Sequence, residues 1–93
     1  MNKWIAQKKL LFCKKGEGDR HPLTIKVGAP FVDEKGISKC PMEWQGLFED
    51  FADIAGADSV HALHLATDTD SLIRKLQNKY DFFWETGEPY FED

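Results

Sequence analysis

The sequence contains few residues of the kinds that carry catalysis or covalent cross-links. Its 93 residues include two cysteines and three histidines, and the cysteines, Cys13 and Cys40, are too far apart for a C-x-x-C motif. This spacing excludes a disulfide-dense secreted scaffold, and we expect two buried free thiols. No serine lies in a nucleophile-elbow pattern, and GEG at 16–18 lacks the third glycine of a dinucleotide-binding loop. The sequence therefore favours a non-enzymatic protein that uses no cofactor over an enzyme.

Long apolar runs are also missing. The longest run, LLFC at 10–13, has the length of a strand and falls far short of the roughly 20 residues that span a bilayer. The lysine-flanked N-terminal segment has no small-residue cleavage site of the kind that follows a signal peptide. We therefore expect a soluble protein of the cytoplasm that does not associate with membranes.

Positive charge is confined to part of the chain. Residues 1–40 hold nine Lys and Arg against four acids, whereas residues 41–73 and 81–93 hold seven and five acids and no Lys or Arg. An acidic surface repels phosphate backbones and attracts basic proteins, so we expect a basic protein partner rather than nucleic acid. The acidic residues that we expect to bind such a partner are Glu43, Glu49, Asp50, Asp53, Glu85 and Glu88.

The first part of the chain has the pattern of antiparallel strands. WIAQKKLLFCK at 4–14 is followed by the glycine-containing turn KGEGDRH at 15–21 and by the alternating segment PLTIKVG at 22–28. Apolar residues at every second position indicate a strand with one buried face. In the second strand the residues that we expect to be buried are Leu23, Ile25 and Val27.

A second pair of strand segments follows. After Phe31 and Val32, DEKG at 33–36 predicts a turn, and KCPMEWQG at 39–46 resumes the alternation. Pro41 lacks a backbone donor, which favours an edge position for this strand. The segment 47–57 fits either a short extra strand or a turn of helix, and Gly56 ends it in both cases. In the strand 39–46 the residues that we expect to point inward are Cys40, Met42 and Trp44.

The periodicity changes to that of a helix from Ser59 to about Asn78. Asp58 or Ser59 is suited to cap this helix, and a final aromatic strand is expected at 82–84. The sequence predicts one α+β domain over 1–93, with an antiparallel sheet of four or five strands and one long amphipathic helix packed on one face. The apolar stripe of this helix comprises Ala62, Leu65, Ala66, Thr69, Leu72, Ile73, Leu76 and Tyr80. The helix would bury Leu65, Ala66, Leu72, Ile73 and Leu76 against Leu23, Ile25, Val27, Met42 and Trp44.

Two histidines and an aspartate lie on the opposite side of this predicted helix. His61, His64 and Asp68 have the i, i+3 and i, i+4 spacings at which helical side chains meet, and such groups can bind a metal ion when another segment supplies a further ligand. The alternative is that they are exposed residues on the polar side of an amphipathic helix, which such positions usually are.

The chain contains a Cys-Pro strand that ends in Gly-Leu, a Gly-x-Asp-Ser helix start, and a Gly-Glu-Pro after the last strand. In these motifs together it resembles a family of small bacterial domains of unknown function. This resemblance implies an α+β fold and no particular activity, and His61 and His64 lie outside the shared pattern. The residues that carry it are Cys40, Pro41, Gly46, Leu47, Gly56, Asp58, Ser59, Ala62, Leu63, Ala66, Gly87, Glu88 and Pro89.

Three hypotheses of function follow from the sequence. The first is a non-enzymatic binding module of the antidote or adaptor type, which meets a basic partner through its acidic surface. The second is a small metal protein or enzyme that uses His61, His64 and Asp68. The third is a homodimer that pairs through an uncovered sheet face or through an edge strand such as 39–45.

Overall fold

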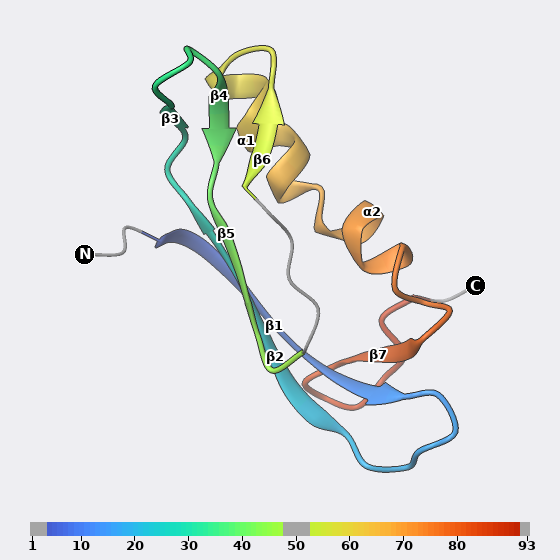
Figure 1. The fold of residues 1–93 in the computed structure, drawn as a ribbon. Helices are drawn as coiled ribbons and strands as arrows, with labels where there is room; N and C mark the ends of the chain where they lie inside the picture. Colours follow the sequence, from blue (N-terminus) through green and yellow to red (C-terminus); the bar gives the residue numbers. More distant parts are fainter. Residues whose placement is uncertain (1–3, 48–52, 92–93) are drawn as a thin grey trace.

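The computed structural model of the chain describes residues 4–47 and 53–91. Within these residues the strands and helices follow one another along the chain as shown in Figure 1. They are β1 Trp4–Lys14, β2 His21–Gly28, β3 Phe31–Val32, β4 Ser38–Cys40, β5 Met42–Gln45, β6 Ile54–Gly56, α1 Ser59–Thr67, α2 Thr69–Arg74 and β7 Tyr80–Trp84. No helix of this described part of the chain is long and apolar enough to cross a bilayer.

The expected single sheet with one long helix is wrong. The described strands form two antiparallel sheets, one with the order β5-β2-β1-β7 and a smaller one with the order β3-β4-β6. The helical segment consists of two short helices of nine and six residues, so the fold is mostly β.

The expected long helix is interrupted at Asp68. This residue has φ −77° and ψ 62°, outside the helical region, and its carboxylate accepts hydrogen bonds from the Ser71 hydroxyl (2.7 Å) and backbone N–H (3.4 Å). Just before it, the Thr67 hydroxyl donates to the Leu63 carbonyl (2.9 Å). Short polar side chains that bind the nearby backbone compete with helix propagation. Asp68 therefore ends α1 and caps α2, which itself ends at Arg74 rather than near residue 78.

The large sheet is organised around the long hairpin of β1 and β2. The predicted strands 4–14 and 22–28 are confirmed, and they pair from Trp4 with Gly28 to Phe12 with His21, with a bulge between Trp4 and Ala6. On the other side of β1, β7 pairs only with its second half, from Leu10 to Lys14. The first half of β1 therefore has a neighbouring strand on one side only among the described residues.

The segment predicted as one strand at 39–46 is divided at Pro41. β4 precedes the proline and pairs with β3 and β6, whereas β5 follows it and pairs with β2. Proline cannot donate to a ladder, and here it marks the point at which the chain passes from one sheet to the other. For the segment 47–57, which fitted either a strand or a turn of helix, residues 54–56 form the short strand β6.

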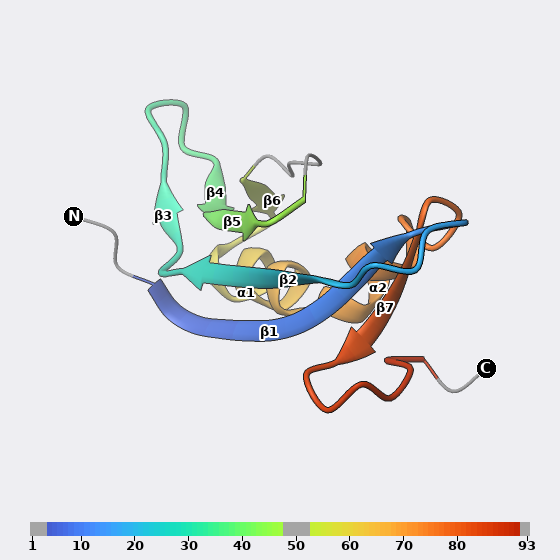
Figure 2. The ribbon, with the colours of Figure 1, turned by 90° about the horizontal axis from the view of Figure 1, so that it is seen from below.

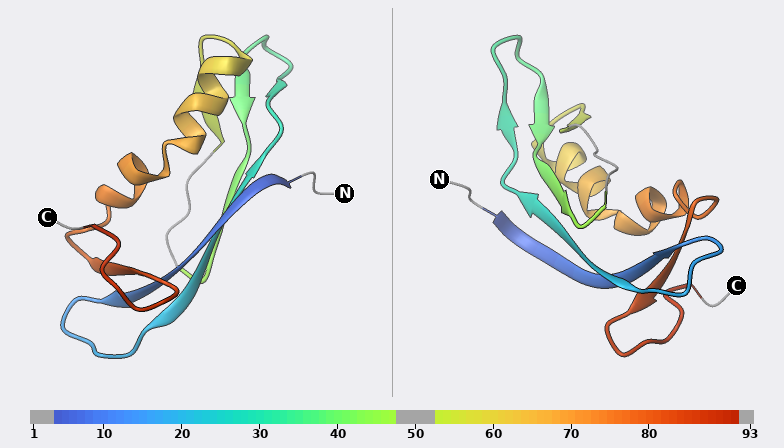
Figure 3. Two further views of the ribbon diagram at one scale, coloured as in Figure 1. Left: turned by 180° about the vertical axis from the view of Figure 1, so that it is seen from behind. Right: turned by 60° about the horizontal axis from the view of Figure 1, so that its bottom comes forward.

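The core lies between one face of the large sheet and the two helices. Figures 2 and 3 show α1 and α2 on the same side of the curved β1–β2 hairpin, and no described helix covers its opposite side. The expected burial of the inward strand residues is confirmed, whereas the expected burial of Leu65 on α1 is wrong, because this side chain is 36% exposed. The largest side chains with almost no exposure are Leu10, Leu23, Ile25, Ile73 and Cys40.

Candidate functional site

His61 supports the start of α1. Its backbone N–H donates to the Asp58 carboxylate (2.8 Å), so Asp58 is the cap of the two predicted candidates, and its ring Nδ1 accepts from the Ala57 N–H (2.8 Å). An N-cap of this kind satisfies backbone donors that have no partner inside the helix. The Nδ1 atom of His61 is thus already occupied by a backbone hydrogen bond.

Asp68 is likewise engaged in local structure. Its hydrogen bonds from Ser71, assisted by the charge of His64, hold the pKa of its carboxyl below the ordinary value. Among the residues that the structure describes, no three or more His, Cys, Asp or Glu side chains are grouped so that they could hold a metal ion. The described residues therefore offer no support for a metal site at His61, His64 and Asp68.

The predicted partner-binding acids are dispersed. Glu43, on β5, lies 3.9 Å from the Lys26 ammonium and accepts a hydrogen bond from the Gln45 amide (3.0 Å). Glu85 and Glu88 follow β7, at the other edge of the same sheet. Asp53 is exposed just before β6, and Glu49 and Asp50 lie outside the described residues. Of the predicted set, the structure brings Glu85 and Glu88 together.

Glu85 and Glu88 line a surface depression of about 480 Å³, which we call the Trp84 hollow. Trp84 is 43% exposed there. The turn that carries both glutamates is closed by hydrogen bonds from the Trp84 N–H to the Glu88 carbonyl and from the Gly87 N–H to the Trp84 carbonyl, each 2.8 Å long. The hollow is lined by Lys8, Lys9, Trp84, Glu85, Thr86 and Glu88.

Lys8, which lines the hollow, also belongs to a polar triad with Tyr90 and Asp70. The Lys8 ammonium donates to the Tyr90 hydroxyl (2.5 Å), lies 3.9 Å from the Asp70 carboxylate, and sits over the Tyr90 ring at 4.9 Å from its centroid. The Tyr90 hydroxyl donates to Asp70. Burial, together with the hydrogen bond to Asp70, raises the pKa of Tyr90 above its ordinary value. The triad joins β1, α2 and the segment that follows β7.

The same aromatic contacts position Trp84. Its ring centroid is 4.6 Å from that of Tyr90, and the Lys8 ammonium is 5.7 Å from the Trp84 centroid. Trp84 pairs with Leu10 across the β1–β7 ladder, and directly paired residues share a face of a sheet. The exposed indole therefore lies against the buried Tyr90 ring and opposite the buried Leu10, with the Lys8 ammonium nearby.

The hollow adjoins residues 6–9 of β1, which have no described neighbouring strand on the β7 side and which we call the open edge. The ladder with β7 stops at Leu10 and Trp84, so within the described chain these four residues pair with β2 alone. Along its inner side runs a groove of about 150 Å³. The groove is lined by Ala6, Gln7, Lys8, Ile25, Val27, Thr67 and Thr69.

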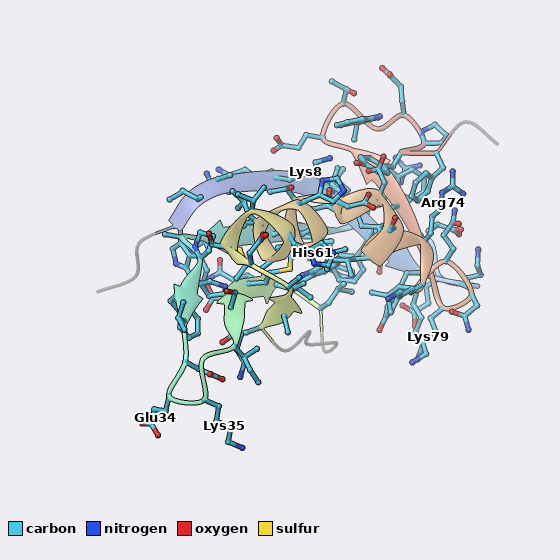
Figure 4. All side chains as sticks on the ribbon, turned by 90° about the horizontal axis from the view of Figure 1, so that it is seen from above. Lys8, Glu34, Lys35, His61, Arg74 and Lys79 are labelled. Carbon is cyan, nitrogen blue, oxygen red and sulfur yellow. The ribbon has the colours of Figure 1, made fainter. Side chains whose placement is uncertain are left out.

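Two other surface features stand apart from this site. The β3–β4 hairpin exposes Phe31, Val32 and Ile37, and Figure 4 shows Glu34 and Lys35 at its tip, directed away from the body of the molecule. A cleft of about 490 Å³ at the other end of the sheet is bounded partly by Leu47, whose following residues are outside the described chain, so its outline gives no basis for a ligand. The cleft is lined by Phe12, Lys14, Glu17, His21, Pro22, Gly46, Leu47 and Tyr80.

Comparisons with known proteins assign no family to the chain. No protein-family model, no curated protein and no solved structure matches it. The resemblance to a family of small bacterial domains therefore stays a prediction.

Sequence reasoning missed most of the hollow. Lys8 and Tyr90, whose side chains are hydrogen bonded, are separated by 82 positions, and no local pattern relates them. A weak signal was present in WETGEP, where a tryptophan adjoins two glutamates in a glycine-containing turn. An exposed aromatic residue beside carboxylates is a known arrangement for binding cations.

Proposed function

We propose that this chain is a non-enzymatic protein-binding module of the antidote or adaptor type, and that the Trp84 hollow receives a Lys or Arg side chain of a basic partner. The observation that carries the proposal is the exposed indole of Trp84 beside Glu85 and Glu88. Neither glutamate side chain has an ion pair or hydrogen bond within the described residues. Two free carboxylates and an aromatic face are the groups that bind a guanidinium or ammonium ion.

The charges around the hollow favour a cation despite two nearby lysines. Lys8 is already held by Tyr90 and Asp70, so its charge is largely compensated. Counted with Asp70, the site holds three carboxylates against Lys8 and Lys9. The partner that matches this balance carries a positive charge.

Binding of a simple cation tests the proposal. The indole N–H signal of Trp84 can be followed by NMR while arginine amide is added, with citrulline amide as the uncharged counterpart. We expect a saturable shift with arginine amide and a much smaller one with citrulline amide. Glu85→Gln combined with Glu88→Gln should weaken arginine binding about threefold or more, because exposed ion pairs contribute roughly 0.2–1 kcal/mol each.

A matched control separates the site from overall charge. Glu17→Gln combined with Glu34→Gln removes the same charge from exposed positions outside the hollow, and this variant should bind arginine amide as the unmodified chain does. Equal weakening by both pairs, or equal shifts with the two amides, would contradict the proposal.

A further inference from the structure

The open edge beside the hollow presents unpaired backbone groups. Backbone N–H and C=O groups alternate in direction along an antiparallel strand, and the Lys15 N–H donates toward the β7 side, to the Lys79 carbonyl (3.0 Å). The odd-numbered residues of β1 therefore point toward β7 and the even-numbered ones toward β2. Since the ladder ends at the pair Leu10 and Trp84, which sets the Lys9 carbonyl against Glu85, the groups that point away from the sheet with no described strand to receive them are the backbone groups of Gln7 and the N–H of Lys9.

Two surface depressions are lined by residues of the same edge. The groove of about 150 Å³ is lined by residues 6–8 of this edge, by Ile25 and Val27 of β2, and by Thr67 and Thr69 beside the break between the helices. The Trp84 hollow begins at Lys8 and continues past the end of β7. An extended segment lying in line with β7 would therefore run beside residues that line this groove and then beside residues that line the hollow.

A second copy of this chain fits the edge poorly. If two edges paired about a two-fold axis at residue 8, Lys8 would lie opposite its own copy, and directly opposed like charges destabilise a sheet. If the axis lay at Gln7, Ile5 would have to pair with Lys9, but the β1–β2 register is broken by a bulge between Trp4 and Ala6. Bulges and lysines at an edge are known protections against self-pairing. The edge is suited to a different chain.

We infer that an extended segment of the basic partner adds as a strand along residues 6–9 of β1, with its backbone on Gln7 and Lys9 and a Lys or Arg side chain in the Trp84 hollow. This inference rests on the proposed function and specifies how the partner is bound. Strand addition of this kind gives affinity through main-chain hydrogen bonds and specificity through side-chain pockets.

Gln7→Pro tests the backbone contact directly. Because the Gln7 N–H points to the open side, proline at this position removes the donor without removing a hydrogen bond of the β1–β2 ladder, as proline in an edge strand can. Gln7→Ala is the matched control, since it removes the side chain and keeps the N–H. The probe is a short synthetic peptide in which valine alternates with arginine.

We expect Gln7→Pro to weaken peptide binding about tenfold or more, and Gln7→Ala to change it by no more than about twofold, since one hydrogen bond and its neighbours are lost only in the first. In the unmodified chain, saturating peptide should slow hydrogen exchange at the amides of Gln7 and Lys9. That second measurement needs no variant, so it decides the question even if Gln7→Pro alters the fold.

The outcomes distinguish this inference from the proposed function. Unchanged hydrogen exchange at the Gln7 and Lys9 amides, or equal peptide binding by the proline and alanine variants, would overturn strand addition. Neither outcome would contradict binding of arginine amide in the hollow. Lack of binding by the peptide would overturn it as well. Loss of arginine amide binding with retained exchange protection would instead show that the edge binds chains without using the hollow.

Discussion

Replacing Tyr90 with phenylalanine removes the hydroxyl group that joins Lys8 to Asp70 and leaves the aromatic ring in place. Tyr90 is 8% exposed, and its ring packs against Trp84 and Phe91, so this packing should survive. The two lost hydrogen bonds involve charged groups, for which about 1.5–3 kcal/mol each is usual. The Asp70 and Lys8 side chains are 61% and 33% exposed, however, and water can replace the hydroxyl on both. We therefore expect Tyr90→Phe to lower the free energy of unfolding by about 1–2 kcal/mol.

Urea unfolding followed by tryptophan fluorescence measures this loss. With a denaturant dependence of about 1 kcal/mol per molar for a chain of this size, the unfolding midpoint should fall by about 1–2 M. Asp70→Asn supplies a double-mutant cycle, because its cost should shrink by about 1 kcal/mol when Tyr90 is already phenylalanine. A midpoint within about 0.3 M of the unmodified chain, or an Asp70→Asn cost that is the same in both backgrounds, would refute the reasoning.

The same substitution has a pH signature. The pKa of Tyr90 is raised above the ordinary value of 10.0 by burial and by the hydrogen bond to Asp70, so the folded state holds the phenolic proton more tightly than the unfolded state does. This contribution to stability is complete below pH 10 and is lost as the pH rises through the higher pKa of the folded state. The advantage of the unmodified chain over Tyr90→Phe should therefore shrink in alkaline solution.

Two further substitutions test the local structure. Gly46→Ala should destabilise the fold by about 2–4 kcal/mol, because residue 46 has φ +113° and an added Cβ would lie 2.2 Å from the Pro22 carbonyl oxygen. Urea unfolding measures this loss, and an unchanged midpoint would contradict the close contact between Gly46 and the Pro22 backbone. Asp68→Ala should lower the melting temperature. The difference from the unmodified chain should disappear as the pH falls through the lowered pKa of Asp68, because protonation weakens the hydrogen bonds from Ser71 to this carboxylate. A difference that persists in acid would show that the cap does not act through the carboxylate.

The strands of the large sheet could be predicted because their signals are local. Alternation placed Leu23, Ile25 and Val27 inward, and all three are buried. The turn at 15–21 separated the two strands, and both were predicted nearly to the residue. Such patterns depend only on which side of a pleated strand faces the core.

The helix and the site were harder to predict for different reasons. The apolar stripe continued through Thr69 and Leu72, and it outweighed the Thr-Asp-Thr-Asp segment, in which the Thr67 and Asp68 side chains bind the backbone and end the helix. The Trp84 hollow depends on which part of β1 receives β7, and that register is set by packing between distant segments. Glu85 and Glu88 could be named from charge, and Trp84 adjoins them in the sequence, but nothing local indicated that Lys8 would lie beside them.

The pairing of β7 with β1 also bears on the order in which the chain folds. The β1–β2 hairpin joins neighbouring segments, whereas Leu10 and Trp84 are brought together only by closing a loop of about 70 residues. Contacts that require long loops are costly in chain entropy and tend to form after local ones. The hollow, which needs groups from both β1 and the turn after β7, would then exist only in chains that have completed folding, and a partner that recognises it would discriminate finished molecules from partly folded ones.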